Sequence, residues 1–211
     1  MLLKLSAACG LHAPSAFTVG WVLGSFAQPA RFDVVEDDIS DLGALTASRP
    51  WLYNQIGGNL TGVLVLVLAL GLWRVLGSGR WARVGVVALA VSGVGQFFDG
   101  VFRLDCRKID PTCTDRLASW HGTAHGIETV VTFVGLFVAM FALGKGFRRL
   151  ESWADLASIS LIAGAAALLT LLVLLPISGG IAVLAASMAF FAWVALVAYR
   201  LLVIARALER G

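Results

Sequence analysis

The sequence predicts an all-α integral membrane bundle of six transmembrane helices, with both termini on the cytoplasmic side. Of its 211 residues, 59% are hydrophobic and only 14% are charged, and the mean hydropathy is +0.87. A soluble domain carries about 25% charged residues, and one core of this length could not bury so much apolar side chain. The composition therefore excludes a soluble domain, a disordered chain and a small disulfide-framework protein.

Six stretches satisfy the length of about 20 mostly apolar residues that a spanning helix needs. Their apolar runs are continuous and do not alternate with period two, which favours helices over strands. The connections alternate between short and long. The expected spans are residues 6–28, 54–76, 81–102, 119–143, 154–176 and 180–204, with outer loops at 29–53 and 103–118, all within a single transmembrane domain, 1–211.

Lys and Arg residues set the expected orientation, because they concentrate on the cytoplasmic side of a membrane protein. One side carries ten of them: Lys4, Arg74, Arg80, Arg83, Lys145, Arg148, Arg149, Arg200, Arg206 and Arg210. The other side carries six: Arg31, Arg49, Arg103, Arg107, Lys108 and Arg116. The long loops are therefore expected outside a bacterial cytoplasmic membrane. The net charge of +3 does not indicate nucleic-acid binding, because the cations form no single stripe.

An alternative interpretation of the first span is a cleaved signal peptide, with Lys4 before the apolar run and Ser25-Phe26-Ala27 near its end. Five spans would then remain in the same orientation. Four tryptophans near the expected boundaries, Trp51, Trp81, Trp120 and Trp153, are interpreted as interface anchors.

Two of the three cysteines lie in the second long loop. Cys106 and Cys113 bracket the segment Arg-Lys-Ile-Asp-Pro-Thr, and an oxidising outer compartment would favour a disulfide between them. A zinc site is less favoured because no second cysteine pair follows. Cys9 lies in the first span and is interpreted as a packing residue.

Polar residues inside the spans gather at one depth, in the outer half of the membrane. His121, His125 and Glu128 follow one another at i, i+4 and i+7 and so share one helix face. Polar residues also occupy the outer ends of the second and third spans, and one shared cavity would keep them from lipid. The candidate catalytic residues are His121, His125, Glu128, Asp99 and Asp105, and the candidate ligand-binding residues are Asp38, Ser40, Asp41, Asn54, Asn59, Gln96, Arg103 and Trp120.

Several chemistries fit this set. His121 and His125 at i, i+4 could ligate a divalent metal such as zinc. Glu128 and His125 could instead act as a metal-free acid–base pair, or the cluster could hold a lipid head group without chemistry. A packing network is the non-functional alternative, with Glu128 paired to His125 or Arg103. A proton pathway is disfavoured because the inner half holds only His12, and serine-hydrolase and nucleotide-binding motifs are absent.

The order of the short motifs carries a family resemblance. Asp38-Ile39-Ser40-Asp41-Leu42-Gly43 precedes Pro50-Trp51-Leu52-Tyr53-Asn54, then Gly95, Gly100, Phe102 and Asp105, and then His121-Gly122 with His125. Over nearly the whole chain this order resembles the bacterial membrane family called domain-of-unknown-function family 998, and more distantly the Frag1/DRAM/Sfk1-type six-span proteins. The resemblance implies six spans and one site containing Ser40, Asp41, Asn54, Asp105, His121 and His125. It implies no activity.

The sequence therefore favours an outer-leaflet polar pocket that binds a lipid or other amphipathic small molecule. Hydrolase- or isomerase-type chemistry, by acid–base or metal assistance, is the enzyme hypothesis. A lipid-binding or helper membrane protein whose polar cluster only fixes helix packing is the alternative.

Overall fold

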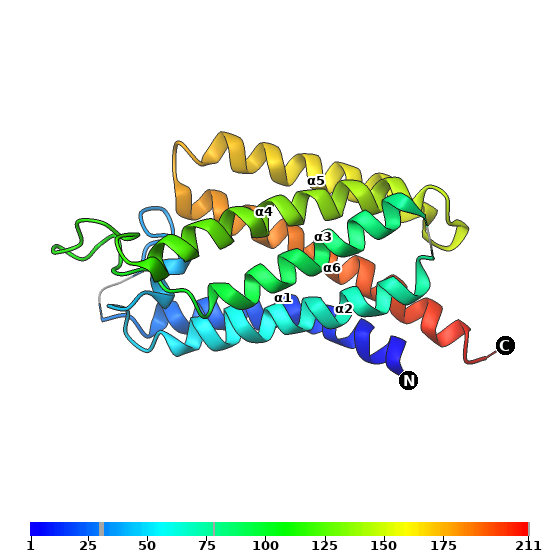
Figure 1. Cartoon of the computed structure of the whole chain (residues 1–211), viewed down its shortest axis with the longest axis horizontal. Helices are drawn as coiled ribbons and strands as arrows, with labels where there is room; N and C mark the ends of the chain where they lie inside the picture. The colour runs from blue at the N-terminus through cyan, green and yellow to red at the C-terminus, as the bar shows by residue number, and fades with distance from the viewer. Residues whose placement is uncertain (30–31, 78, 211) are drawn as a thin grey trace.

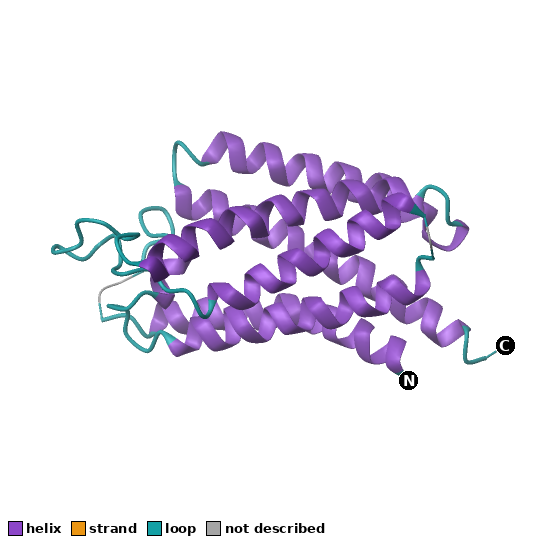
Figure 2. Cartoon of the chain, in the orientation of Figure 1, coloured by secondary structure: helices purple, strands orange, loops and turns teal. Residues whose placement is uncertain are grey.

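The computed structural model, which describes residues 1–29, 32–77 and 79–210, is a bundle of six long helices without strands among those residues (Figures 1 and 2). Three short helical segments, η1 (Ile39–Gly43), η2 (Leu52–Leu60) and η3 (Glu151–Trp153), lie in the connections. The long helices are α1 (Leu2–Phe26), α2 (Thr61–Val75), α3 (Arg80–Asp99), α4 (Trp120–Phe147), α5 (Ala154–Leu174) and α6 (Gly179–Ala207).

Five helical segments are long and apolar enough to cross a membrane: Leu52–Val75, Arg80–Asp99, Trp120–Phe147, Glu151–Leu174 and Gly179–Ala207. The first of these joins η2, which is wound as a π-helix, to α2 without a break. α1 has a comparable length of 25 residues, but it contains Lys4, His12 and Pro14 and is less apolar. The structure thus supports a multi-pass helical membrane protein with five candidate spans among its six long helices.

The long helices form a ring in chain order. Each packs against the next, and α6 packs against α1 to close the ring. α5 meets α4 through glycines: a Cβ on Gly144 would lie 2.9 Å from the Leu161 side chain, and one on Gly164 would lie 3.1 Å from Met140. Toward the loop end of the bundle, α5 diverges from α4 (Figure 1). Helices α4 and α5 are therefore closest toward the end that holds the termini and farther apart beside the long loops.

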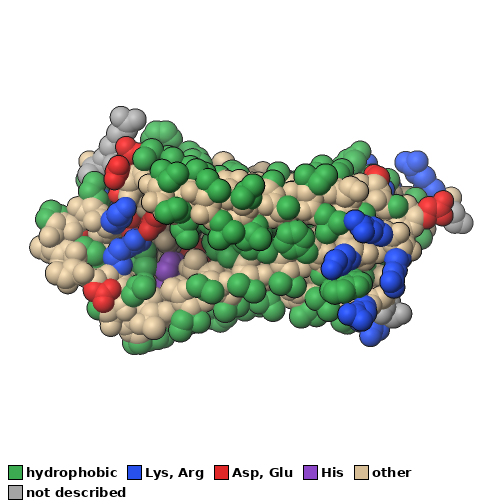
Figure 3. Space-filling view, turned by 90° about the horizontal axis from the view of Figure 1, so that it is seen from above, with side chains coloured by type: hydrophobic (Ala, Val, Ile, Leu, Met, Phe, Trp, Pro, Cys, Tyr) green, Lys and Arg blue, Asp and Glu red, His purple; other side chains and the backbone are tan. Residues whose placement is uncertain are grey.

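Both termini lie at one end of the bundle, and the two long connections lie at the other (Figure 1). In the space-filling view, Lys and Arg side chains gather at the end that holds the termini, and a band of mostly apolar surface separates them from the loop end (Figure 3). This arrangement agrees with the expectation that both long loops fall on the same side. Arg31, which was counted with the loop side, lies outside the described residues.

A disulfide closes part of the second long loop, and ion pairs join the second long loop to the first. Cys106 and Cys113 form the expected disulfide, with their Cα atoms 5.7 Å apart. The Arg116 guanidinium binds two carboxylates of the first loop, Asp38 at 2.6 Å and Asp41 at 2.8 Å. These contacts hold the loops together as a cap over the end of the bundle.

For one of the four tryptophans, Trp153, the predicted position at the membrane interface is wrong. Trp153 is buried and its ring stacks on Phe147, with ring centroids 4.9 Å apart. The short η3 segment turns the chain back toward the bundle and carries this ring into the core. Trp51 and Trp120 are exposed, as an interface position requires.

Reduction of the Cys106–Cys113 disulfide is expected to lower the stability of the folded protein by about 2 kcal/mol, because the bond closes a short loop and so removes little entropy from the unfolded chain. Thermal melting in detergent with and without a reductant measures the change. A Cys9→Ser variant should show the same shift, because Cys9 forms no disulfide. A melting temperature that reduction leaves unchanged would contradict the expectation.

Candidate functional site

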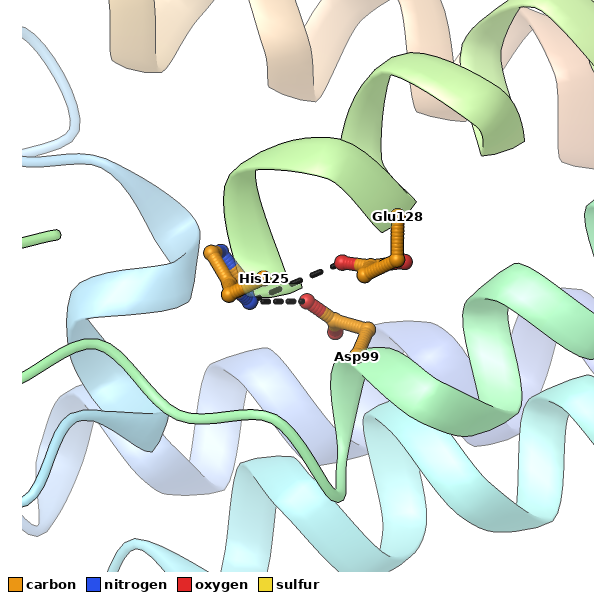
Figure 4. Close-up of side chains that lie close together, drawn as sticks. All are labelled: Asp99, His125 and Glu128. Carbon is orange, nitrogen blue, oxygen red and sulfur yellow. Dashed lines mark ion pairs between the residues drawn. The ribbon is translucent and has the colours of Figure 1, made fainter. Parts of the chain in front are cut away.

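Three ionisable side chains converge inside the loop end of the bundle. Asp99 is the last residue of α3, and His125 and Glu128 lie one turn apart on α4 (Figure 4). The His125 Nδ1 atom is 3.6 Å from Asp99 Oδ1 and 3.5 Å from Glu128 Oε1. The three side chains are only 7%, 12% and 10% exposed for His125, Asp99 and Glu128 respectively. We call Asp99, His125 and Glu128 the acidic–histidine cluster.

Neighbouring groups fix the orientation of this cluster. The Thr132 hydroxyl donates to Glu128 Oε2 at 3.2 Å. The Thr129 hydroxyl lies 3.1 Å from Glu128 Oε1 and 2.9 Å from the His125 carbonyl oxygen, so these two acceptors share its one hydrogen. The Phe102 carbonyl oxygen lies 3.1 Å from His125 Nδ1. No Lys or Arg in the described part of the chain forms an ion pair with Asp99 or Glu128. Two carboxylates therefore share a single imidazole in a nearly closed space.

A cavity of about 60 Å³ lies beside the cluster, which is room for about two water molecules. Asp99 and Glu128 line it together with Tyr53, Gln96 and Ser40. A larger hollow of about 590 Å³ lies between this cavity and the loops, and it reaches His125. The cavity and the hollow share Ser40, Thr129 and Val183 as lining residues.

The hollow opens between α4 and the turn from α5 to α6. Gly126 lines it on α4, and Leu175, Gly179 and Val183 line it on the opposite side. Figure 3 shows a recess beside the loops with a histidine and acidic side chains inside it. The cluster is thus reached through an opening that is polar toward the loops, where Arg116 and Lys108 line it, and apolar toward the α5–α6 turn, where Leu175 and Val183 line it.

Several predicted ligand-binding residues form hydrogen bonds to backbone carbonyls and so hold segments of the chain together. The side-chain amide of Asn54 donates to the Gly43 carbonyl at 3.1 Å, and that of Asn59 donates to the Phe97 carbonyl at 2.6 Å. Arg103 donates to the carbonyls of Gly43 and Ala44. Arg103 therefore braces the first loop and does not pair with Asp99 or Glu128. Gln96 lines the cavity while donating to the Gly57 carbonyl.

His121 lies apart from the acidic–histidine cluster. Its ring packs on Trp120, with centroids 3.6 Å apart, and it lines neither the cavity nor the hollow. The predicted ligand pair of His121 and His125 is therefore not assembled among the described residues. One turn of helix separates the two rings, and the half-buried His121 ring lies against the exposed Trp120 ring and not against His125.

Asp105 also lies outside the cluster. It belongs to the second long loop, and its side chain contacts the N-terminus of α4. Its carboxylate accepts from the Ser119 backbone N–H at 2.7 Å, and Ser119 in turn caps the helix by accepting from the Gly122 N–H. Hydrogen bonds from Ser119 lower the pKa of Asp105. A negative charge at a helix N-terminus is also favourable. Asp105 thus positions the helix that carries His125 and Glu128.

Asp41, buried beneath Arg116, makes the loop cap sensitive to pH. Burial raises the pKa of this carboxyl from 3.8 to about 6, and the Arg116 charge only partly opposes the shift. The folded state therefore binds the proton more tightly than the unfolded state. The stability gained from protonation is complete below about pH 4 and is lost as the pH rises through about 6.

An Asp41→Asn variant is expected to lack this pH dependence. The wild-type protein should lose up to about 3 kcal/mol of stability from this group between pH 4 and pH 7. The difference in melting temperature between wild type and variant, followed over that range, isolates the contribution. Asp38→Asn removes the other carboxylate on Arg116. Because the Asp38 charge also helps to raise the pKa of Asp41, this variant should keep the direction of the slope and reduce its size. If the melting temperatures of wild type and Asp41→Asn changed in parallel with pH, Asp41 would not be the source of the pH dependence.

Three residues that complete the cavity, Tyr53, Thr129 and Thr132, are not among the site residues predicted from the sequence. Tyr53 is buried on η2 and lies beside Asp99, and Thr129 and Thr132 hold Glu128. Thr129 and Thr132 lie one and four residues after Glu128, so the helical period that grouped the histidines with Glu128 could also have found Thr132. Nothing in the sequence indicates that a π-helix would carry Tyr53 inward.

Comparison with known proteins gives one family. The model of the family described as "Protein of unknown function (DUF998)" matches residues 11–200, which includes every residue of the acidic–histidine cluster and both long loops. No curated protein matches the chain, and no solved structure matches it. The family match covers most of the sequence, so the chain belongs to the DUF998 family.

Proposed function

We propose that this protein is a six-span membrane protein that binds the polar head of a lipid, or of another amphipathic small molecule, in the outer half of the membrane. The observation that carries the proposal is the acidic–histidine cluster at the inner end of a hollow that opens between α4 and the α5–α6 turn. Buried ionisable groups in a membrane bundle are costly and are retained mainly for function.

The opening suits an amphipathic ligand. Polar groups of the loops, including Arg116 and Lys108, line its upper part, and Leu175 and Val183 line its lower part. A ligand entering sideways from the outer leaflet would keep its hydrocarbon tail against α4, α5 and α6. Its polar head would then extend toward His125, through the space that Ser40 and Thr129 border.

The proposed topology places this opening in the outer leaflet of a bacterial cytoplasmic membrane. α1 would be the sixth span, since it runs along α2 and α6 within the ring. Both termini and the basic end of the bundle would face the cytoplasm. The disulfide would then lie in an oxidising compartment, which is where such bonds persist.

The cluster supports acid–base chemistry on the bound head group. The imidazole of His125 can accept and donate a proton, and the two carboxylates beside it can stabilise its charged form. The reaction class proposed is hydrolysis or isomerisation of a group that reaches Glu128 and His125. Tyr53 and Gln96 would position that group from the opposite wall.

The competing function is packing alone. The hydrogen bonds of Asn54, Asn59 and Arg103 to backbone carbonyls favour it, because those predicted ligand residues act as braces. The acidic–histidine cluster differs from them. Both of its carboxylates line the cavity, which Asn54, Asn59 and Arg103 do not. The Asp99 Oδ2 atom is buried without a hydrogen-bond partner in the described part of the chain, but so is the Asn54 Oδ1 atom, so the cavity is what sets the cluster apart.

A lipid-retention experiment with paired histidine variants separates these functions. The full chain is purified from membranes in a mild detergent, washed extensively, and its retained lipids are measured by mass spectrometry. Wild type and His121→Ala are expected to retain the same lipid class, and His125→Ala is expected to lose it. If all three proteins retain the same lipids while His125→Ala only melts at a lower temperature, the packing function is correct.

A further inference from the structure

We infer that Asp99, His125 and Glu128 form a binding site for one divalent transition-metal ion of the zinc type. Each residue offers one ligand atom, and these atoms all lie within 4.8 Å of one another. The site differs from the histidine pair that the sequence suggests, since it draws one ligand from α3 and two from α4. This inference depends on the proposed function in one respect: the metal site and the proposed ligand would occupy the same cavity.

The spacing of the donor atoms fits a coordination sphere. Zinc binds nitrogen and oxygen ligands at about 2.1 Å, so two ligands of a tetrahedral site are about 3.4 Å apart. The His125 Nδ1 atom lies 3.5 Å from Glu128 Oε1 and 3.6 Å from Asp99 Oδ1. The protein thus supplies one nitrogen and two carboxylate oxygens. Both nitrogen–oxygen separations are close to the required value, all three donor atoms lie within 4.8 Å of one another, and side-chain movements would draw the two carboxylates onto one ion.

Hydrogen bonding alone explains the arrangement less well. His125 Nδ1 faces three oxygens, those of Asp99, Glu128 and the Phe102 backbone carbonyl at 3.1 Å. One nitrogen carries at most one hydrogen, so it can donate well to only one of them. The Asp99 Oδ2 atom is buried and has no hydrogen-bond partner in the described part of the chain. A cation bound to His125 Nδ1 would satisfy the Asp99 and Glu128 carboxylates together.

The charge of the cluster favours the same conclusion. Two ionised carboxylates and an imidazolium would leave a net negative charge in the membrane, and no Lys or Arg within the described residues pairs with it. A proton on one carboxylate or a divalent ion between the two would remove that charge. Two carboxylates, a neutral imidazole and a divalent ion sum to zero. The carboxylate of Glu128 is further oriented by Thr129 and Thr132, as outer hydrogen bonds orient the ligands of known metal sites.

Three protein ligands leave a fourth position open, as in catalytic zinc sites. The cavity of about 60 Å³ adjoins both carboxylates, so that position would be filled by water or by the head group of the ligand. A water bound there would be more acidic than bulk water. The hollow beside His125 gives a small ion a path from the loop side.

Metal binding to the purified full chain tests the inference. The protein is treated with a chelator, dialysed, and titrated with Zn²⁺ and separately with Co²⁺. We expect one metal ion per chain and a visible Co²⁺ absorption that indicates a low-coordinate nitrogen–oxygen site. Asp99→Asn, His125→Ala and Glu128→Gln should each lose at least 10-fold in affinity, and His121→Ala, the matched histidine on the same helix, should bind as wild type does.

Two results would overturn the inference: wild-type protein that binds neither ion at micromolar concentration, or a His125→Ala variant with unchanged affinity. If a variant does not fold, X-ray absorption of the Co²⁺-loaded wild-type protein must show one imidazole ligand with all other ligands being oxygens. A site with no imidazole, with more than one, or with sulfur contradicts the inference. Lipid retention by metal-free protein would separate the failure of this site from failure of the proposed function.

Discussion

Gly62→Ala is expected to destabilise the folded protein by about 3 kcal/mol and to prevent its accumulation in the membrane. A Cβ at this position would lie 2.4 Å from the Phe97 backbone nitrogen and 2.6 Å from the Gly93 carbonyl oxygen. Both atoms belong to the α3 backbone, so no side-chain rotation can relieve the overlap. α2 would have to move away from α3.

This displacement would reach the candidate site. Asn59 lies one turn before Gly62 and donates to the Phe97 carbonyl at 2.6 Å, so separating the helices would also stretch that bond. Phe97 lies two residues before Asp99, which contributes one of the three ionisable groups. Loss of stability and displacement of the Asp99 carboxylate are therefore expected together.

Gly126→Ala is the matched control. A Cβ on Gly126 would meet only the Leu117 side chain, at 3.5 and 3.8 Å, which is ordinary contact. Alanine also favours a helix over glycine by about 1 kcal/mol, so the control should be at least as stable as wild type. Thermal melting and membrane yield of the two variants measure the effect, and equal melting temperatures would show that α2 and α3 are less closely packed than described.

The helices of this fold could be predicted from the sequence because each apolar run is long enough to span a membrane. The grouping of His125 and Glu128 with Asp99 could also be predicted in outline. Helical period places the first two on one face, and the length of the third span places Asp99 at a similar depth. These inferences need only the geometry of single helices and a common membrane boundary.

Other features of the site depend on contacts between distant segments. The direction of the Arg103 side chain is set by the carbonyls of Gly43 and Ala44, about 60 residues earlier in the chain. η2 extends the second helix into the first long loop through π-helical winding and places Tyr53 in the cavity. The sequence could not show which of His121 and His125 joins the cluster. The helical period places both on one face of α4, but it does not show which turn of α4 lies beneath the loops.

Glu128→Gln is expected to raise the stability of the metal-free protein while abolishing both metal binding and retention of the ligand. Asp99 and Glu128 are two carboxylates beside one imidazole, without an ion-pairing Lys or Arg among the described residues. A neutral amide of the same shape removes their repulsion. Its oxygen can still accept from Thr129 or Thr132. In Glu128→Gln the Asp99 carboxylate still pairs with His125, so no buried charge is left without a partner. The desolvation cost of the second carboxylate is removed, and that cost can exceed the Coulombic gain of a buried charge.

The measurement is the melting temperature in the presence of a chelator, with lipid retention measured on the same preparation. We expect Glu128→Gln to melt about 2–4 °C higher than wild type, which corresponds to about 1 kcal/mol for a chain of this length, and to retain no specific lipid. Thr132→Val is the matched variant, because it removes one hydrogen bond to the Glu128 carboxylate and leaves the charge. It should melt at a lower temperature than wild type.

The directions in which Glu128→Gln and Thr132→Val change the melting temperature distinguish ligand binding from a purely structural role of the cluster. If the cluster only fixes helix packing, both Glu128→Gln and Thr132→Val must lower the melting temperature, because each weakens the same network. If the cluster exists for a ligand, its carboxylates are a cost in the free protein that natural sequences accept at functional sites. A stabilised Glu128→Gln protein without ligand would therefore mean that Glu128 is maintained for binding and chemistry.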